Sequence, residues 1–180
     1  MLRPFVVGPR WSASSDCVAV GGGWRLVAAA SLSAAGRSVC ATGPEEEAMA
    51  LRWYSNVIES TDHRRLAAWW RDALDWQIIF ETDDEAVVIP KWAEEIAPKL
   101  TFHQFPPGLV FVPVEHEKQT KNRLHMDLAP HLDDDRDAEI ARLEAMGAKR
   151  IDVGQPADAT WTVLADIDGN EFCVLSSREM

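Results

Sequence analysis

Two stretches in the second part of the chain carry apolar residues at helical spacing. The first stripe is formed by Leu66, Trp69, Trp70, Ala73 and Leu74, and Thr61 or Asp62 stands where a side chain can cap the helix start. The second stripe is formed by Ile140, Leu143 and Met146; Asp134 or Asp135 can cap it, and Gly147 stands where a helix would stop. These patterns predict two amphipathic helices.

Runs with strand character bracket both helices. The runs cover residues 52–59, 76–81, 85–90, 109–114, 123–129, 149–153, 160–165 and 171–176. The last two are separated by Asp166-Ile167-Asp168-Gly169-Asn170, which has the composition of a hairpin turn, so we expect Asp166 and Asp168 to serve the turn. Residues 91–107, which include Trp92, have the character of a loop. The sequence therefore predicts an α+β fold with the order βαβββ occurring twice.

The first 48 residues differ from the rest in composition. Gly, Ala, Ser and Val dominate them and no helical or alternating period is sustained, which predicts disorder. Glu45-Glu46-Glu47 stand just before Met49, and purine-rich Glu codons before a start codon resemble a bacterial ribosome-binding site. We therefore expect either a flexible tail or an over-extended gene reading, with one folded domain over residues 49–180.

Charge and cysteine usage narrow the classes of function. The formal net charge is −11, and residues 1–48 are balanced, so the acidic excess lies in the predicted domain. Such a surface would repel a phosphate backbone, which argues against nucleic acid as a partner. The three cysteines have no metal-binding or disulfide spacing, and no apolar run reaches the roughly 18 residues of a membrane span. These features predict a cytoplasmic protein that does not bind membranes.

Two strands of the second half separate apolar from polar side chains, because side chains alternate across a strand. In one strand, Leu124, Met126 and Leu128 share a face, and Arg123, His125 and Asp127 share the other. In the last strand, Phe172 and Val174 oppose Glu171 and Cys173. The apolar faces are expected to pack under a helix. The polar faces must then be turned to solvent or to a wet cleft, and this is where we expect function.

Three segments resemble bacterial glyoxalase-like proteins of the vicinal oxygen chelate superfamily. They are residues 121–128, residues 164–175, and Asp62 followed by Leu66-Ala67-Ala68-Trp69-Trp70. The resemblance spans residues 51–177 and implies two modules, about 51–115 and 121–177, whose curled mixed sheets enclose a cleft. In metal-dependent members, the first and last strands of each module supply ligands to a divalent ion. The ion acts as a Lewis acid on a substrate that chelates it through neighbouring oxygens.

The resemblance places the four metal-ligand positions on Ser55, Val112, His125 and Cys173. A catalytic metal needs three or four protein ligands, and Ser and Val are poor candidates beside one His and one Cys. We therefore expect no resident cofactor and an incomplete metal site in which His125 alone is a typical ligand. If the alignment slips by a residue, Glu59 or Glu171 could be recruited and a divalent metal bound.

Several residues are candidates for the chemistry of the cleft. Asp127 can orient His125 or raise its pKa, which would make His125 a general acid or base, while a satisfied polar histidine is the alternative. Because family topology pairs the first and last strands of a module, Cys173 should neighbour His125 and is a candidate nucleophile, although a buried Cys is usually inert. The candidate ligand-binding residues are Trp53, Ser55, Glu59, Val112, Trp161 and Glu171. Trp69 and Trp70 are expected in the core, and Trp92 could cover the cleft mouth.

Two classes of function fit this pattern. The first is a glyoxalase-like protein that binds a small polar metabolite in its cleft without a complete metal site, as drug-sequestering bleomycin-resistance proteins hold a ligand without chemistry. The second is a metal-dependent lyase, isomerase or dioxygenase of the same superfamily. The expected partner is a small molecule, and pairing of two copies, which many family members show, is left open by the sequence.

Overall fold

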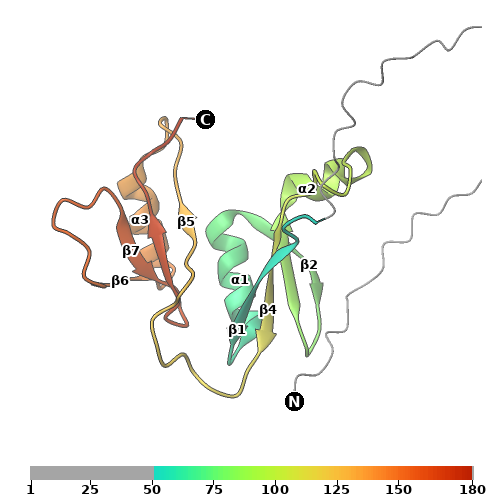
Figure 1. The fold of residues 1–180 in the computed structure, drawn as a ribbon, viewed down its shortest axis with the longest axis horizontal. Coiled ribbons are helices and arrows are strands. Elements are labelled where there is room, and N and C mark those ends of the chain that lie inside the picture. Colours follow the sequence, from blue (N-terminus) through green and yellow to red (C-terminus); the bar gives the residue numbers. More distant parts are fainter. Residues whose placement is uncertain (1–50, 180) are drawn as a thin grey trace, which may run out of the picture. The chain divides into compact units, whose positions relative to one another are not determined.

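The computed structural model of the protein describes residues 51–179. The predictions for residues 1–48, and the proposed start at Met49, lie outside the described residues. The first module consists of β1 (Ser55–Ser60), α1 (His63–Leu74), β2 (Trp76–Glu81), β3 (Ala86–Pro90), α2 (Lys91–Ile96), a 3₁₀ turn (Ala97–Lys99) and β4 (Gly108–Pro113). The second consists of β5 (Asp127–Leu128), α3 (Arg136–Ala145), β6 (Lys149–Arg150), β7 (Thr162–Ala165) and β8 (Glu171–Val174). The doubled βαβββ order is confirmed (Figure 1).

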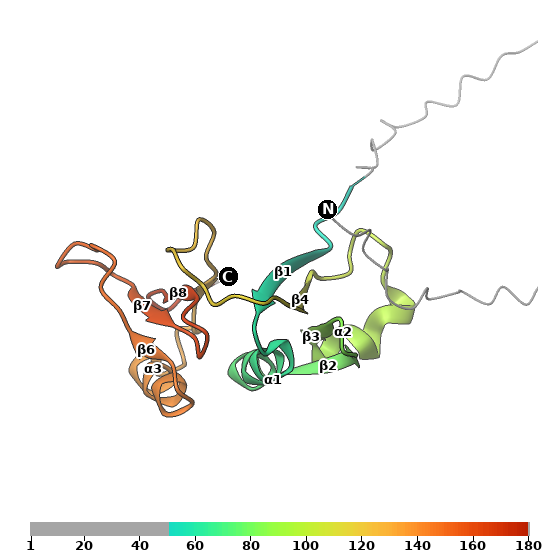
Figure 2. The ribbon, with the colours of Figure 1, turned by 90° about the horizontal axis from the view of Figure 1, so that it is seen from below.

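Each module forms a four-stranded mixed sheet, and the two sheets have the same topology. The orders are β1-β4-β3-β2 and β5-β8-β7-β6. In both, the first strand of the module runs parallel to the last, and the remaining neighbours are antiparallel. The parallel pairing brings the first and last strands together, as the resemblance implies. Figure 2 shows α1 lying along one side of its sheet.

Both main helices begin where the sequence allows a cap. The Asp62 carboxylate accepts a hydrogen bond from the backbone N–H of Arg65 at 3.1 Å and starts α1. The Asp135 carboxylate accepts from the N–H groups of Asp137 and Ala138 and starts α3, so Asp62 and Asp135 are the caps among the predicted alternatives. Gly147 follows α3 with φ of 105°, a conformation that a residue with a Cβ rarely adopts, and so ends the helix.

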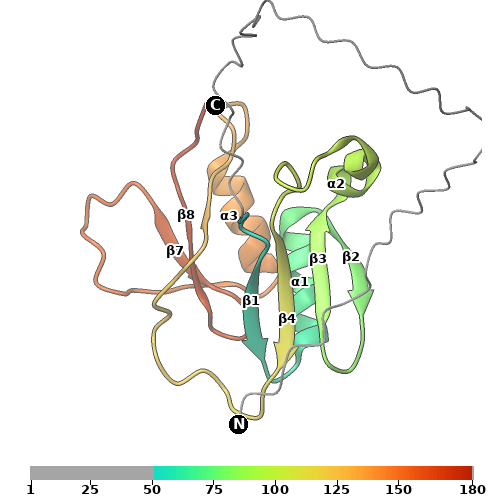
Figure 3. The same cartoon turned by 45° about the vertical axis from the view of Figure 1, so that its right-hand side comes forward.

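The core of the described residues draws on both modules. Trp69 and Trp70 of α1 pack edge to face with each other, and both meet Phe172 of β8, with ring centroids 5.1–6.0 Å apart. Ile140 and Leu143, which belong to α3 (Figure 3), are part of the same cluster. The prediction that Trp69 and Trp70 are core residues is confirmed, since they are 7% and 1% exposed.

Hydrogen bonds also join α1 and β1 to the second module. The indole Nε1–H of Trp70 donates to Asp166 at 3.0 Å, and the indole of Trp69 donates to the carbonyl oxygen of Met146 at 2.9 Å. The Ser60 hydroxyl donates to Asp168 at 2.5 Å. Asp166 also accepts from the N–H groups of Asp168 and Asn170, so its predicted turn role is confirmed and extended by a contact with α1.

Local predictions were wrong for one loop and for the length of two strands, and the strand expected over 149–153 is reduced to Lys149–Arg150. Residues 91–99 form α2 and a 3₁₀ turn where a loop was expected; the six-residue helix is too short to show a helical period, and its only buried side chain is Ala93. The strand expected over 123–129 is reduced to Asp127–Leu128, and Leu124 is 89% exposed. Asp127 pairs with Cys173, so Leu124 would lie opposite Asn170, in the turn before β8 begins. Within the described part of the chain, no helix has the length and apolar character to cross a membrane.

Candidate functional site

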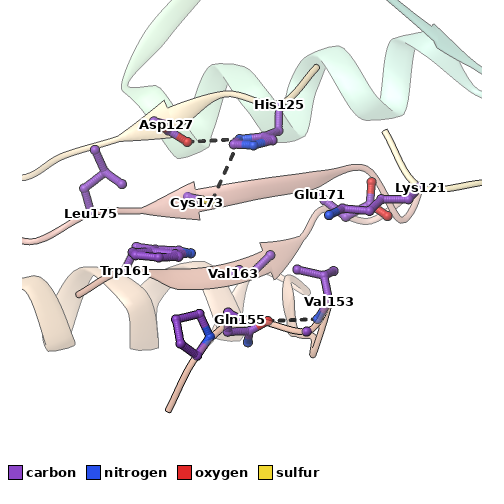
Figure 4. A pocket seen from close by; sticks show the side chains of 12 residues that line it. Lys121, His125, Asp127, Val153, Gln155, Trp161, Val163, Glu171, Cys173 and Leu175 are labelled. Atoms are coloured by element: carbon purple, nitrogen blue, oxygen red, sulfur yellow. Dashed lines mark hydrogen bonds and ion pairs between the residues drawn. The ribbon is translucent and has the colours of Figure 1, made fainter. Parts of the chain in front are cut away.

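A pocket of about 420 Å³ lies over the polar face of the β5-β8-β7 side of the second sheet. That volume is within the range of small-molecule sites. Its lining includes seven residues with polar or aromatic side chains: Lys121, His125, Asp127, Gln155, Trp161, Glu171 and Cys173. Figure 4 shows His125 and Asp127 on one side of Cys173 and Trp161 on the other, which follows the strand order of the sheet.

His125 and Asp127 form a hydrogen-bonded pair at the edge of this pocket. The Nδ1 atom of His125 lies 3.0 Å from a carboxylate oxygen of Asp127, and both side chains are about half exposed. An Nδ1–H that donates to the carboxylate leaves Nε2 as the ring atom free to accept or exchange a proton. The predicted orientation of His125 by Asp127 is therefore present in the structure. It is the geometry that a general acid or base needs.

Cys173 lies in the floor of the pocket beside this pair. Its Sγ atom is 3.9 Å from Nδ1 of His125, and the residue itself pairs along the backbone with Asp127. Burial raises the pKa of the Cys173 thiol, and the negative charge of Asp127 raises it further. The neighbour relation with His125 is confirmed as a side-chain contact. The environment keeps the thiol protonated and so works against the thiolate that a nucleophile requires.

Glu171 lines the pocket but its carboxylate already has partners. It accepts hydrogen bonds from the Lys118 ammonium and from the backbone N–H of Asn122, both at 2.8 Å, and its side chain is 10% exposed. Burial by itself would raise the pKa of this carboxyl, but these two donors hold it below its ordinary value. Glu171 thus ties the segment before β5 to β8.

The fit of a metal can be judged from the available donors. His125, Asp127 and Cys173 offer three ligand atoms that lie within 4.8 Å of one another. The two positions that the family would supply from the first module are Ser55 and Val112, and Val112 has no ligating atom. If the resemblance places these positions correctly, Ser55 and Val112 do not complete a four-ligand site with His125 and Cys173. What remains is a three-donor cluster confined to the second module.

The first-module candidates lie away from this pocket. Ser55 and Glu59 belong to β1 and Val112 to β4, where Val112 pairs with Glu59. Trp53 precedes β1, is 66% exposed and donates its indole N–H to the carbonyl oxygen of Ser55 at 3.3 Å. None of these four lines the pocket described above. Of the predicted site residues, the structure brings together His125, Asp127, Trp161, Glu171 and Cys173.

The pocket also contains residues that the sequence did not single out for function. Lys121 stands beside Glu171, and the loop between β6 and β7 contributes Val153, Gln155 and Pro156. Lys121 belongs to the segment 121–128 that carries the family resemblance, so its place just before the polar strand could have indicated that it lies near the site. The sequence of the loop between β6 and β7 contains no such indication, because its composition does not show in which direction the loop folds. Trp92, on α2, is 51% exposed and is not part of this lining.

Comparison with known proteins agrees with this architecture. The chain has no match among curated proteins. A glyoxalase/bleomycin resistance protein/dioxygenase family enzyme from Burkholderia phytofirmans PsJN matches 71% of this chain and 100% of its own length, with 14% identity and a TM-score of 0.53. The fosfomycin resistance protein FosX from Listeria monocytogenes, in complex with Mn(II) and sulfate, matches 69% of this chain and 88% of its own, with 11% identity and a TM-score of 0.49.

The family assignment rests on sequence and fold together. The family described as "Glyoxalase-like domain" matches residues 55–175, which run from the first residue of β1 to just beyond β8. The doubled module and the parallel pairing of first and last strands in each are those of that fold. The chain belongs to the glyoxalase-like domain family.

Proposed function

We propose that the protein binds a small polar metabolite over the polar face of its second module, without the complete divalent metal site of metal-dependent relatives. The observation that carries this proposal is the pocket itself, in which a hydrogen-bonded His125–Asp127 pair and Trp161 flank Cys173. Trp161 supplies apolar contact area, and the polar pair fixes orientation. Val112 at a ligand position supports metal independence.

The test measures binding to protein from which metal has been removed with EDTA. Pyruvate, benzoate, benzamide, benzamidine and glucose serve as probes in ligand-observed NMR. We expect saturable binding of at least one probe, weakened about tenfold or more by His125→Ala, because Nε2 of the imidazole is the atom of the pair that is left free to contact a ligand. His116→Ala, at an exposed histidine outside the pocket lining, is the matched control and should bind as the unchanged protein does.

Two results would overturn the proposal. One is stoichiometric metal in the purified protein, measured by mass spectrometry, that is lost in His125→Ala. The other is binding of the probes that is equal in the unchanged protein and in His125→Ala. Either result would show that His125 does not bind a ligand in a metal-independent way.

The three-donor cluster of His125, Asp127 and Cys173 supports a second candidate, a metal-dependent lyase, isomerase or dioxygenase. Imidazole, carboxylate and thiolate are all ligands of zinc, and a catalytic zinc site uses three protein ligands. Titration with Zn²⁺ separates the candidates, since this alternative requires tight one-to-one binding that Cys173→Ser weakens. Pairing of two copies is a separate prediction, which light scattering of the purified protein tests.

A further inference from the structure

Most polar groups in the pocket are already engaged with other parts of the protein. Glu171 is held by Lys118 and Asn122, and Asp127 by His125. The amide of Gln155 is used at both ends, since its Oε1 accepts from the N–H of Val153 and its Nε2 donates to the carbonyl oxygen of Ile151. A ligand cation would have to displace Lys118 to reach Glu171, whereas Asp127 is engaged at one oxygen only, by His125.

Lys121 is the exception among the charged residues that line the pocket. Within residues 51–179, its ammonium group has neither a hydrogen bond nor an ion pair, whereas the neighbouring Lys118 is bound to Glu171. Lys121 belongs to the pocket lining and lies beside Glu171 (Figure 4). Among the described residues, Lys121 is thus the one charged group of the lining that has neither a hydrogen bond nor an ion pair.

The rest of the surface is apolar and includes one aromatic ring. Trp161 is half buried and lies on the β7 side, near Val163 and the Val153–Pro156 loop. The ring does not belong to the Trp69, Trp70 and Phe172 cluster, which packs on the core side of the sheet. A flat ligand could stack on this indole or meet its edge, as aromatic pairs do.

Building on the proposed function, we infer that the ligand is a small aromatic or planar monocarboxylate. Its carboxylate meets the Lys121 ammonium, and its apolar part lies against Trp161. The neutral thiol of Cys173 and the imidazole of His125 lie between these two ends and can contact the middle of the ligand. A volume of about 420 Å³ accommodates a single ring with a short acidic substituent.

A series of three probes with the same ring but different charge tests the inference. Benzoate, benzamide and benzamidine are titrated into the full chain labelled with ¹⁵N on tryptophan, and the indole resonance of Trp161 is assigned with Trp161→Phe. We expect benzoate to bind about tenfold more tightly than benzamide, with benzamidine weakest. Higher salt should reduce the preference, because a partly exposed charge pair is screened.

The variants assign the preference to Lys121. Lys121→Gln should bring benzoate to the affinity of benzamide, whereas Lys149→Gln, on exposed β6 and outside the pocket lining, should leave the tenfold preference intact. Both variants remove one positive charge, so a difference between them cannot arise from net charge.

The outcomes distinguish this inference from the proposed function beneath it. Equal binding of benzoate and benzamide at Trp161, or a preference for benzamidine, overturns the inference. The proposed function is still supported in that case if His125→Ala weakens the binding. The absence of any shift at Trp161 with all three probes also overturns the inference. The proposed function then stands or falls on the binding of pyruvate and glucose to metal-free protein.

Discussion

Asp166 links α1 to the turn before β8, and its removal gives a sharp test of how the two modules are held together. Its carboxylate accepts from the indole N–H of Trp70 at 3.0 Å, from the backbone N–H groups of Asp168 and Asn170 at 2.9 Å, and from the side-chain amide of Asn170. Asp166→Ala deletes the acceptor for all of these donors. The Trp70 ring is 1% exposed, so the indole N–H has no contact with bulk solvent that could supply another partner.

The expected loss follows from these contacts. A buried donor left without an acceptor costs about 1–3 kcal/mol, and the partly buried turn amides add about 1 kcal/mol because water can still reach them. We expect Asp166→Ala to reduce the free energy of unfolding by about 3 kcal/mol at pH 7. Asp166→Asn should lose less, about 1–2 kcal/mol, because its amide oxygen still accepts while its NH₂ group faces donors.

Urea-induced unfolding, followed by tryptophan fluorescence and circular dichroism, measures these losses. A double-mutant cycle with Trp70→Phe isolates the indole contact, and we expect a coupling energy of about 1–2 kcal/mol between the two sites. A loss below about 1 kcal/mol for Asp166→Ala, or additive effects in the cycle, would refute the role given to this carboxylate.

The pH dependence of Asp166 has a defined sign. Burial raises the pKa of its carboxyl above the ordinary value of 3.8, although the hydrogen bonds from Asn170, Trp70 and Asp168 oppose this. The folded protein therefore holds this proton at a pH where the unfolded chain has released it. The contribution to stability is fully present below pH 3.8 and is lost as the pH rises through the raised value. The difference in unfolding free energy between the unchanged protein and Asp166→Asn, measured from pH 3.5 to 7, should follow this trend. A difference that does not depend on pH contradicts it.

Three further predictions concern β8 and its contacts. Phe172→Ala should cost about 3–5 kcal/mol in urea unfolding, because its ring is 1% exposed and packs against Trp70; a loss under 2 kcal/mol would show that the core closes around the cavity. The pKa of Glu171 is lowered, so its contribution to stability should be present at neutral pH and be lost as the pH falls below the ordinary value of 4.5. Glu171→Gln should remove this part of the acid-induced loss of thermal stability. A variant whose unfolding temperature depends on pH as that of the unchanged protein does would contradict this prediction. Cys173 should react with iodoacetamide more slowly at pH 8 than free cysteine does, since burial and Asp127 raise its pKa; peptide mass spectrometry that finds equal rates would contradict the protonated thiol.

Local residue patterns were enough to predict most of the secondary structure. The stripes at Leu66 and Ile140, the acidic caps and Gly147 each act over a few residues, so they identify α1 and α3 without knowledge of the rest of the chain. The strand ends were less well predicted, because pairing depends on where the partner strand begins. Leu124 has the alternation of a strand residue but no partner there, since β8 starts only at Glu171. The short helix α2 was not predicted, because six residues are too few to show a helical repeat of apolar side chains.

For the site, the sequence by itself determined the polar strand faces, and so His125, Asp127 and Cys173 were predicted together. Alternation along a strand is a local property, and the parallel pairing of β5 with β8 came from the family resemblance. Only the tertiary structure decided that Glu171 is engaged by Lys118, that Lys121 has no partner within residues 51–179, and that the β6–β7 loop joins the pocket. The contact between Lys118 and Glu171 joins residues 53 positions apart, and it forms only when the segment before β5 folds back over the sheet. A local pattern carries no information about that path.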